Sequence, residues 1–266
     1  MLETYSGATK IIPLLGHPVV QTKSPYGMTK ALAERDIDAI VVPIDVAPDA
    51  VSAVLNSLDR VENLGGVLAT FPHKFALCDH AGVRTQRASF FGSANAMRRT
   101  RTGEWQADML DGIGFVRAIR RRGGGISDRH VFLVGAGGAG GAIAFELLHA
   151  GAASIAVQDI EAERRDRLIA KLNKHFADKA SAGSVLTSSY DLVINATPLG
   201  MQPDDPTPID VAGIDGSMFV GDVVTAPNDT PLIAAAKLAE AACCSGHDMF
   251  DATLKMQMEF FIESWA

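Results

Sequence analysis

The chain has 266 residues, of which 47% are hydrophobic and 21% are charged, and its formal net charge is −7. This length accommodates two ordinary domains, and the composition is that of a globular protein. An acidic chain lacks the basic face on which nucleic-acid binders depend, and no run of about 18 apolar residues predicts a membrane span.

The cysteines and the first ten residues indicate the cellular compartment in which the protein is expected. Cys78, Cys243 and Cys244 have no regular spacing, so the sequence predicts neither a disulfide framework nor a zinc site. The first ten residues include Glu3 and no long apolar run, which does not fit a signal peptide. We therefore expect a cytoplasmic protein with no metal, no nucleic-acid partner and no membrane partner, present as a monomer or a homodimer.

Strand-like and helical segments alternate along the first part of the chain. The predicted strands are Lys10–Leu15, Ala39–Ile44 and Gly65–Ala69. Helical spacing covers Pro25–Arg35 and Pro48–Leu58, with Pro48 at a favourable first helical position. Such alternation predicts βαβ units and a parallel sheet.

The same alternation continues in the second part. The predicted helices are Asp111–Arg122, Ala139–Ala150, Glu161–Phe176, Pro231–Ala242 and Asp251–Trp265; the predicted strands are His130–Val134, Ser154–Gln158, Asp191–Asn195 and Met218–Val223. The first of these helices ends at Gly123-Gly124-Gly125, a strong stop signal. We predict an α/β protein of two domains, with residues 1–112 completed by a C-terminal helix (241–266), and a Rossmann-type domain over residues 113–240.

A glycine-rich turn joins a predicted strand to a predicted helix. Gly135, Gly137 and Gly140 satisfy the G-x-G-x-x-G pattern: the first glycine permits the tight turn, the second lets a pyrophosphate approach, and the third lets helix and strand pack closely. Asp159 follows the next predicted strand at about the interval of 20 residues expected for an acidic ribose ligand. The pattern favours dinucleotide binding over an ordinary tight turn, with the phosphates at the helix N-terminus.

Six short strings carry a family resemblance. They are Gly16–Pro25 (GHPVVQTKSP), Thr70–Lys74 (TFPHK), Gly92–Asn95 (GSAN), Asp111–Phe115 (DGIGF), Asn195–Met201 (NATPLGM) and Asp222–Val224 (DVV). In this order and spacing the chain resembles the shikimate dehydrogenases over nearly its whole length. The Pro-His-Lys and Asn-Ala-Thr-Pro-Leu-Gly-Met strings are the most specific.

The resemblance implies two α/β domains with a cleft between them, the first binding substrate and the second a nicotinamide cofactor. Members of this family reversibly reduce a ring ketone of a polyhydroxylated cyclohexene carboxylate, and Lys74 and Asp111 match their catalytic pair. The chemistry is consistent, because hydride transfer to a carbonyl leaves an alkoxide that must gain a proton. A lysine beside an aspartate can relay that proton, whereas the alternative is a structural ion pair.

The resemblance also assigns binding residues. Thr22 and Ser24 match two hydroxyls that hold the substrate carboxylate, although Ser24 before Pro25 is also a plausible helix N-cap. Thr70 and Asn95 match groups that bond ring hydroxyls. The remaining expected substrate residues are Thr225, Thr253 and Gln257. The expected cofactor residues are Gly135, Gly137, Gly138, Ala139, Gly140, Asp159, Asn195, Ala196, Thr197 and Pro198.

Several positions depart from the family pattern. Gln21 replaces a histidine, Leu68 an asparagine, Met109 and Leu110 an Asn-Thr pair, Thr225 a tyrosine and Thr253 a glutamine. The loss of a buried polar contact weighs heavily in discrimination between related substrates. We therefore expect the reaction class to be retained, and the sequence leaves four candidate substrates open: shikimate itself, quinate, an amino analogue or a less hydroxylated ring acid. The alternative function is an NAD(H)-binding sensor with little turnover.

The residues after the second strand of the dinucleotide domain predict NAD as the preferred cofactor and NADP as a weaker one. NADP-dependent family members usually carry Asn-Arg-Thr there, whereas this chain has Gln158-Asp159-Ile160. A carboxylate accepts hydrogen bonds from the ribose hydroxyls and repels a 2′-phosphate. Arg164 and Arg165, one turn into the next helix, would partly offset that repulsion, and Asp159 also fits a helix N-cap.

Overall fold

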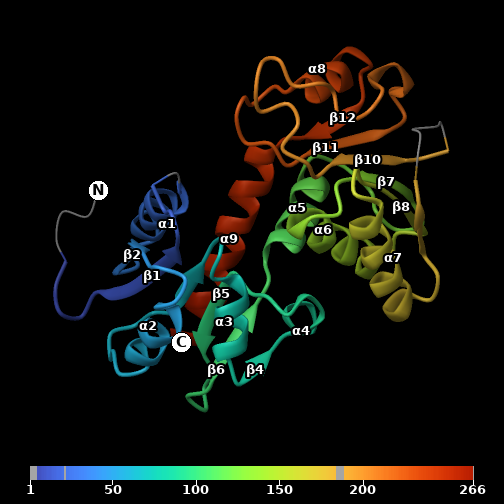
Figure 1. Cartoon of the computed structure of the whole chain (residues 1–266). Helices are drawn as coiled ribbons and strands as arrows, with labels where there is room; N and C mark the ends of the chain where they lie inside the picture. Colours follow the sequence, from blue (N-terminus) through green and yellow to red (C-terminus); the bar gives the residue numbers. More distant parts are fainter. Residues whose placement is uncertain (1–4, 21, 184–188, 266) are drawn as a thin grey trace. The chain divides into compact units, whose positions relative to one another are not determined.

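The structure is a computed structural model that describes residues 5–20, 22–183 and 189–265 (Figure 1). The chain divides into two compact units. The first unit comprises Met1–Leu110 with Leu254–Ala266, and the second comprises Asp111–Thr253. Each unit is built around its own six-stranded sheet with helices packed against it, which is the predicted α/β class.

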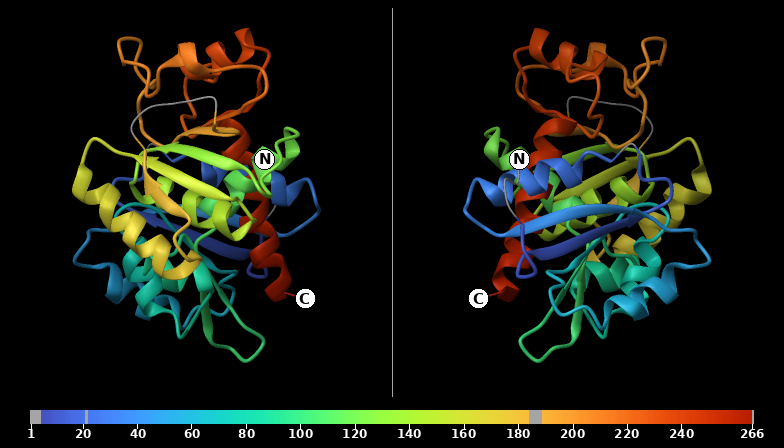
Figure 2. Two further views of the ribbon diagram at one scale, coloured as in Figure 1. Left: turned by 90° about the vertical axis from the view of Figure 1, so that its right-hand side faces the viewer. Right: turned by 90° about the vertical axis from the view of Figure 1, so that its left-hand side faces the viewer.

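The sheet of the first unit has the strand order β2-β1-β3-β5-β6-β4. Its strands are β1 (Lys10–Gly16), β2 (Ala39–Asp45), β3 (Val67–Ala69), β4 (Val83–Arg84), β5 (Ala96–Arg99) and β6 (Trp105–Asp108). β1 pairs in parallel with β2 and β3, as predicted, but β5 runs antiparallel to both β3 and β6. β5 and β6 form a hairpin (Figure 2). In its tight turn Gly103 has φ +85° and the Thr100 N–H donates to the Glu104 carbonyl, which makes these two strands antiparallel.

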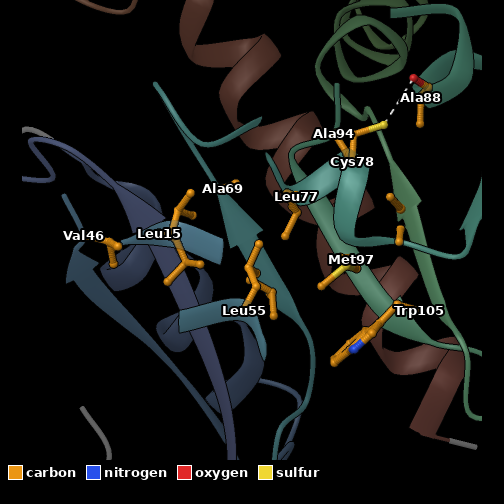
Figure 3. Close-up of a cluster of buried hydrophobic side chains, with 14 residues drawn as sticks. Leu15, Val46, Leu55, Ala69, Leu77, Cys78, Ala88, Ala94, Met97 and Trp105 are labelled. Carbon is orange, nitrogen blue, oxygen red and sulfur yellow. Dashed lines mark hydrogen bonds between the residues drawn. The ribbon is translucent and has the colours of Figure 1, made fainter. Parts of the chain in front are cut away.

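The helices of the first unit enclose an apolar core. They are α1 (Ser24–Ala33), α2 (Val51–Leu58), α3 (Lys74–His80) and α4 (Gln86–Phe91). Leu15, Leu55, Leu77 and Met97 meet in this core, and Cys78 donates its Sγ–H to the Ala88 carbonyl (Figure 3).

The start of α2 differs from the prediction. Ala50 is its N-cap, and a turn from Ala47 to Ala50 precedes it, so Pro48 lies in that turn instead of at the first helical position.

The sheet of the second unit is parallel throughout its observed pairings. Its order is β12-β11-β10-β7-β8-β9, with β7 (His130–Val134), β8 (Ser154–Gln158), β9 (Ala180–Ala182), β10 (Leu192–Asn195), β11 (Phe219–Asp222) and β12 (Ala242–Cys244). The helices are α5 (Asp111–Arg121), α6 (Gly138–His149), α7 (Ala162–Phe176) and α8 (Pro231–Leu238), with a short 3-10 turn at Val211–Gly213. β7 and β8 have the predicted bounds because strands buried on both faces read as short apolar runs.

The last helix, α9 (Gly246–Trp265), begins five residues earlier than Asp251 and belongs to both units. β12 pairs with β11, so residues 241–253 lie with the second unit and not with residues 1–112, where their sequence predicts them. The end of α9 packs in the first unit, where Trp265 donates its Nε1–H to the Gly65 carbonyl (2.8 Å). None of the helices in the described part of the chain is long and apolar enough to cross a membrane.

Candidate functional site

Strand ends gather the expected substrate residues of the first unit at one edge of its sheet. Thr70 follows β3, and its N–H binds the Leu15 carbonyl near the end of β1 (2.9 Å). Asn95 precedes the antiparallel strand β5, so it lies at the same edge, and its carbonyl accepts from Ala69 N–H (3.1 Å). We call this edge, with Thr70, Lys74 and Asn95, the substrate edge.

Lys74 is the first residue of α3 and is partly buried. Its carbonyl accepts a hydrogen bond from Ala94 N–H (2.9 Å), which ties the start of α3 to the residue before Asn95. His73 is 2% exposed, and its Nε2 lies 2.7 Å from the Val46 carbonyl. The Pro-His-Lys string therefore contains one anchoring histidine and one lysine at the substrate edge.

Asn95 is 3% exposed and its amide has a defined orientation. The Oδ1 atom accepts from Leu110 N–H (2.8 Å), so the amide NH₂ lies on the opposite side. The Asn95 N–H donates to the Asp108 carbonyl (2.9 Å). Asn95 is therefore held by the segment that leads into Asp111, and its Oδ1 is occupied by the Leu110 N–H.

Thr22 and Ser24, the two residues expected to bind the substrate carboxylate, differ in the hydrogen bonds that their hydroxyl groups make. Thr22 donates its Oγ1–H to the Val19 carbonyl (2.8 Å), a local bond that consumes its donor. Ser24 is the first residue of α1, whose N-cap is Lys23, and no described side chain caps that helix. The N-cap alternative for Ser24 therefore has no support in the geometry.

The residues that depart from the family pattern are mostly buried. Leu68, Met109 and Leu110 are 1%, 6% and 2% exposed. Gln257, on α9 in the first unit, is 8% exposed. Gln21 lies outside the described residues.

The second unit contains Asp111, Thr225 and Thr253. Asp111 is the first residue of α5, where the helix dipole favours a negative charge. Thr225 is exposed. Thr253 is 8% exposed and packs on Gly114, and its Oγ1 has no hydrogen-bond partner among the described residues. The Thr253 hydroxyl is thus a buried donor that remains to be satisfied.

The glycine loop has the three properties that a dinucleotide requires. Gly135 has φ +104°, a conformation that other residues rarely adopt. A Cβ on Gly140 would overlap the Gly135 carbonyl oxygen, so strand and helix are in close contact there. No described atom lies within 4 Å of the Cβ positions of Gly137 or Gly138, and Ala139 is only partly buried. This open backbone lies at the N-terminus of α6, a favourable site for a phosphate.

A buried network shapes the neighbouring loop. Asn195 is fully buried; its Oδ1 accepts from the Thr197 N–H and hydroxyl, and its Nδ2 donates to Asp222 (3.0 Å). Burial raises the pKa of Asp222 despite hydrogen bonds from Thr230, Val224, Asn195 and Val223. Ala196 lies against Gly135, whereas Pro198 is exposed. Ala196 and Thr197 are therefore adjacent to the glycine loop.

Asp159 lies at the end of β8 with its carboxylate already bonded. Oδ2 accepts from Ala136 N–H (2.6 Å) and Arg164 Nε–H (3.1 Å), and Oδ1 accepts from Glu161 N–H (2.8 Å) and Arg164 Nη2–H (2.7 Å). Burial by itself raises the pKa of Asp159, but these hydrogen bonds outweigh it and hold the pKa below the usual range. The carboxylate remains ionised and links the glycine loop to α7.

Sequence reasoning did not identify Thr230 and Asp222 as partners in the Asn195 network, nor the contact of Arg87 with the Asp108 carboxylate. The Arg164–Asp159 pair was also missed as a contact. An arginine five residues after an aspartate gives no pairing signal, because the two are not on adjacent helical turns. In the described part of the chain no group of three or more metal-ligating side chains occurs.

Comparison with known families agrees with this geometry. Residues 14–97 match the model of the shikimate dehydrogenase substrate binding domain. The shikimate dehydrogenase (NADP⁺) of Methanocaldococcus jannaschii is 34% identical over 249 residues, which cover 91% of this chain and 87% of that enzyme. The enzyme of the same name from Salinibacter ruber is 34% identical and covers 91% of this chain and 88% of its own.

Solved structures show the same fold. A shikimate dehydrogenase crystallised with NADP⁺ is 26% identical, with a TM-score of 0.88 over 97% of this chain and 91% of its own. Shikimate 5-dehydrogenase from Listeria monocytogenes is 22% identical, with a TM-score of 0.92 over 99% and 95% of the two chains, and shows the fold alone. The chain therefore belongs to the shikimate dehydrogenase family, whose members are NAD(P)-dependent oxidoreductases that act on CH–OH groups.

Proposed function

We propose that the protein catalyses reversible hydride transfer between a nicotinamide cofactor and the ring hydroxyl or ketone of a cyclohexene or cyclohexane carboxylate, such as shikimate, quinate or a close analogue. The observation that carries this proposal is the substrate edge, where Thr70, Lys74 and Asn95 come together through main-chain bonds. An ammonium group and an amide donor at one edge suit an oxygen that gains negative charge during reduction.

Each side chain has a distinct task in this mechanism. When bound, the nicotinamide supplies or accepts the hydride. Lys74, with Asp111 as its partner in the acid–base pair, holds the reacting oxygen and gives or takes its proton. The Asn95 amide donates to a ring hydroxyl, and the Ser24 hydroxyl donates to the substrate carboxylate. The open backbone at Gly137 and Gly138 fits the pyrophosphate of the cofactor.

The proposed cofactor preference is NAD over NADP. Asp159 is an ionised carboxylate at the ribose position of the glycine-loop fold. Four hydrogen bonds already occupy the two oxygens of the Asp159 carboxylate, so a ribose hydroxyl must displace one of the donors. Arg164 is the donor that can move, because its side chain is 37% exposed. A 2′-phosphate meets the Asp159 charge directly, while Arg164 offsets part of that repulsion and keeps NADP as a weaker cofactor.

A substrate panel tests the reaction. Purified protein is incubated with shikimate, quinate, amino analogues and less hydroxylated ring acids, each with NAD and NADP, and reduced nicotinamide is followed by absorbance. We expect turnover of at least one ring acid. For shikimate we expect a Michaelis constant in the upper part of the usual range of about 1 μM–1 mM, or above it, because Leu68 and Met109 have apolar side chains and Thr225 replaces the usual tyrosine. Tight binding and fast turnover of shikimate would contradict the expected substrate site.

The ratio of catalytic efficiencies with NAD and NADP tests the cofactor preference. Wild type should favour NAD, and Asp159→Ala should shift the ratio toward NADP by about tenfold or more, since hydrogen bonds to charged groups contribute about 1.5–3 kcal/mol. Asp166→Ala is the matched control, because Asp166 pairs with Arg165 on the same helix without touching the glycine loop. A wild type that prefers NADP, or an unchanged ratio in Asp159→Ala, removes Asp159 from the ribose site.

The departures from the family pattern at Leu68, Met109 and Thr225 favour a second function, an NAD(H)-binding protein with little turnover. Its distinguishing result is tight NADH binding with no conversion of any acid in the panel. The proposed acid–base pair of Lys74 and Asp111 favours the enzyme, because a sensor has no need of one.

A further inference from the structure

A partly buried ion pair lies beside the substrate edge without being part of it. Asp108, at the end of β6, has a side chain that is 4% exposed, and Arg87 on α4 binds both of its carboxylate oxygens, through Nε and Nη2, at 2.7 Å each. The Thr85 hydroxyl and the Met109 N–H also donate to Oδ1, each at 2.7 Å. An ion pair of this kind is weak evidence for stability, because well-packed apolar residues in its place are often as stable.

The main chain around Asp108 holds Asn95. The Asp108 carbonyl accepts from Asn95 N–H (2.9 Å), and two residues later Leu110 N–H donates to Asn95 Oδ1 (2.8 Å). The Asp108 carboxylate fixes the intervening Met109 N–H. The segment from Asp108 to Leu110 is therefore fixed by one carboxylate and in turn sets the orientation of the Asn95 amide.

The same chain of contacts reaches Lys74. Ala94 N–H donates to the Lys74 carbonyl (2.9 Å), so the residue before Asn95 is bonded to the start of α3. All of these contacts lie within the first unit. The segment also runs directly into Asp111 through the peptide bond that follows Leu110.

We propose that Arg87 and Asp108 are positioning residues for the reaction: their bidentate pair fixes the segment from Asp108 to Leu110 and thereby aims the Asn95 amide at the substrate. The activity measurements rest on the proposed function. Loosening the pair misplaces Asn95 without removing any group that touches substrate. A misplacement of about 1 Å costs on the order of 10²-fold in rate.

Arg87→Lys is the principal variant, since lysine keeps the charge but cannot form the planar two-bond contact. We expect the turnover number with the best ring acid to fall about 10- to 100-fold, while the pH profile keeps its shape because Lys74 remains the acid–base group. The dissociation constant for the cofactor should not change. Arg98→Met is the matched control. Arg98 lines a cavity of about 470 Å³ together with Arg87 and Asp108, but it binds Glu263 and the Phe260 carbonyl. The turnover of Arg98→Met should equal that of wild type.

A double variant separates positioning from stability. Arg87→Leu combined with Asp108→Leu replaces the ion pair with apolar side chains and should recover much of the melting temperature. If the pair positions Asn95, turnover per folded molecule stays low in this variant. If the pair is merely structural, turnover returns together with stability, and the proposal is wrong.

Hydrogen exchange supplies a readout that needs no substrate. The Leu110 N–H should exchange faster in Arg87→Lys than in wild type or Arg98→Met. Unchanged exchange together with unchanged turnover in Arg87→Lys overturns the proposal, as does an equal loss of turnover in Arg98→Met. A wild type that converts no ring acid refutes the proposed function; faster Leu110 exchange in Arg87→Lys would still support the positioning of Asn95, and unchanged exchange would refute it.

Discussion

The proton transfer in the proposed reaction depends on the Lys74 side chain. We expect Lys74→Ala to lower turnover by about 10²–10⁴-fold, the usual effect of a lost acid–base group. Cofactor affinity should not change, because the glycine loop belongs to the other unit. Lys30→Ala, which removes an exposed lysine from α1, is the control. Steady-state kinetics with the best substrate provide the measurement, and near-normal turnover of Lys74→Ala excludes Lys74 as the proton donor.

The two hydroxyl residues before and at the start of α1 should contribute unequally to carboxylate binding. A hydroxyl has one donor, and Thr22 uses its donor on the Val19 carbonyl. A carboxylate needs donors, so Ser24→Ala should raise the Michaelis constant for a ring acid more than Thr22→Val does. Thermal melting should show little change for Ser24→Ala, since Lys23 is the N-cap. A lower melting temperature with an unchanged Michaelis constant would instead support a capping role for Ser24.

At the scale of one element, the strand–loop–helix unit from β7 to α6 contains two glycines whose roles in stability and in cofactor binding can be tested separately. Gly140→Ala should lower the melting temperature without cofactor, because its Cβ would overlap the Gly135 carbonyl oxygen. Gly137→Ala should leave that melting temperature unchanged, since Gly137 has φ −73° and open space around its Cβ position. It should weaken cofactor binding, because the new methyl group occupies space that the pyrophosphate needs. Calorimetric titration with NADH distinguishes the two variants, and equal effects would contradict separate roles.

The elements recognised from the sequence are those with the clearest pattern. β7, β8 and α6 have compact apolar or glycine-rich signatures and were placed within one residue of their observed bounds. β4, β5, β6, β9 and β12 contain two to four residues each and were not predicted. Such short strands form because a neighbouring strand offers hydrogen-bond partners, and that information is not local in the sequence.

For the whole molecule, paired aspartates predict how stability depends on pH. The His130 N–H, helped by Arg129, lowers the pKa of Asp191, and burial only partly opposes this. For Asp248, burial raises the pKa, but Arg122 and Ser245 outweigh it and the net shift is downward. A carboxyl with a lowered folded pKa contributes stability above its unfolded pKa, and loses that contribution as the pH falls through the folded pKa.

We therefore expect the free energy of unfolding to fall as the pH drops below the ordinary aspartate pKa of 3.8. Asp191→Asn should make this fall less steep, and Asp49→Asn, at an exposed turn, should not change it. Denaturant unfolding at a series of pH values is the measurement. A wild type whose stability rises on acidification, or an Asp191→Asn slope equal to that of wild type, would contradict the assignment.

The sequence by itself determined the α/β class, the glycine loop and the family strings. The glycine loop is recognisable because its requirements are local in the sequence. Each of Gly135, Gly137 and Gly140 meets a backbone requirement of one short strand–turn–helix segment. Lys74 and Asn95 are recognisable only through the strings around them. The domain limits depend on strand pairing between segments far apart in the sequence. An example is β12, which belongs to the second unit because it pairs with β11.

Only the tertiary structure decided which polar side chains form hydrogen bonds and ion pairs with one another. Asp159 holds Arg164 and the glycine loop, and Asp108 holds Arg87 and the segment behind Asn95. These partners come from different elements, and the side chain of an aspartate in a sequence looks the same whether it caps a helix, binds a ribose or fixes an arginine. Hydrogen bonds are directional and short, so their partners are set by the folded positions of the strands and helices, which no local pattern specifies.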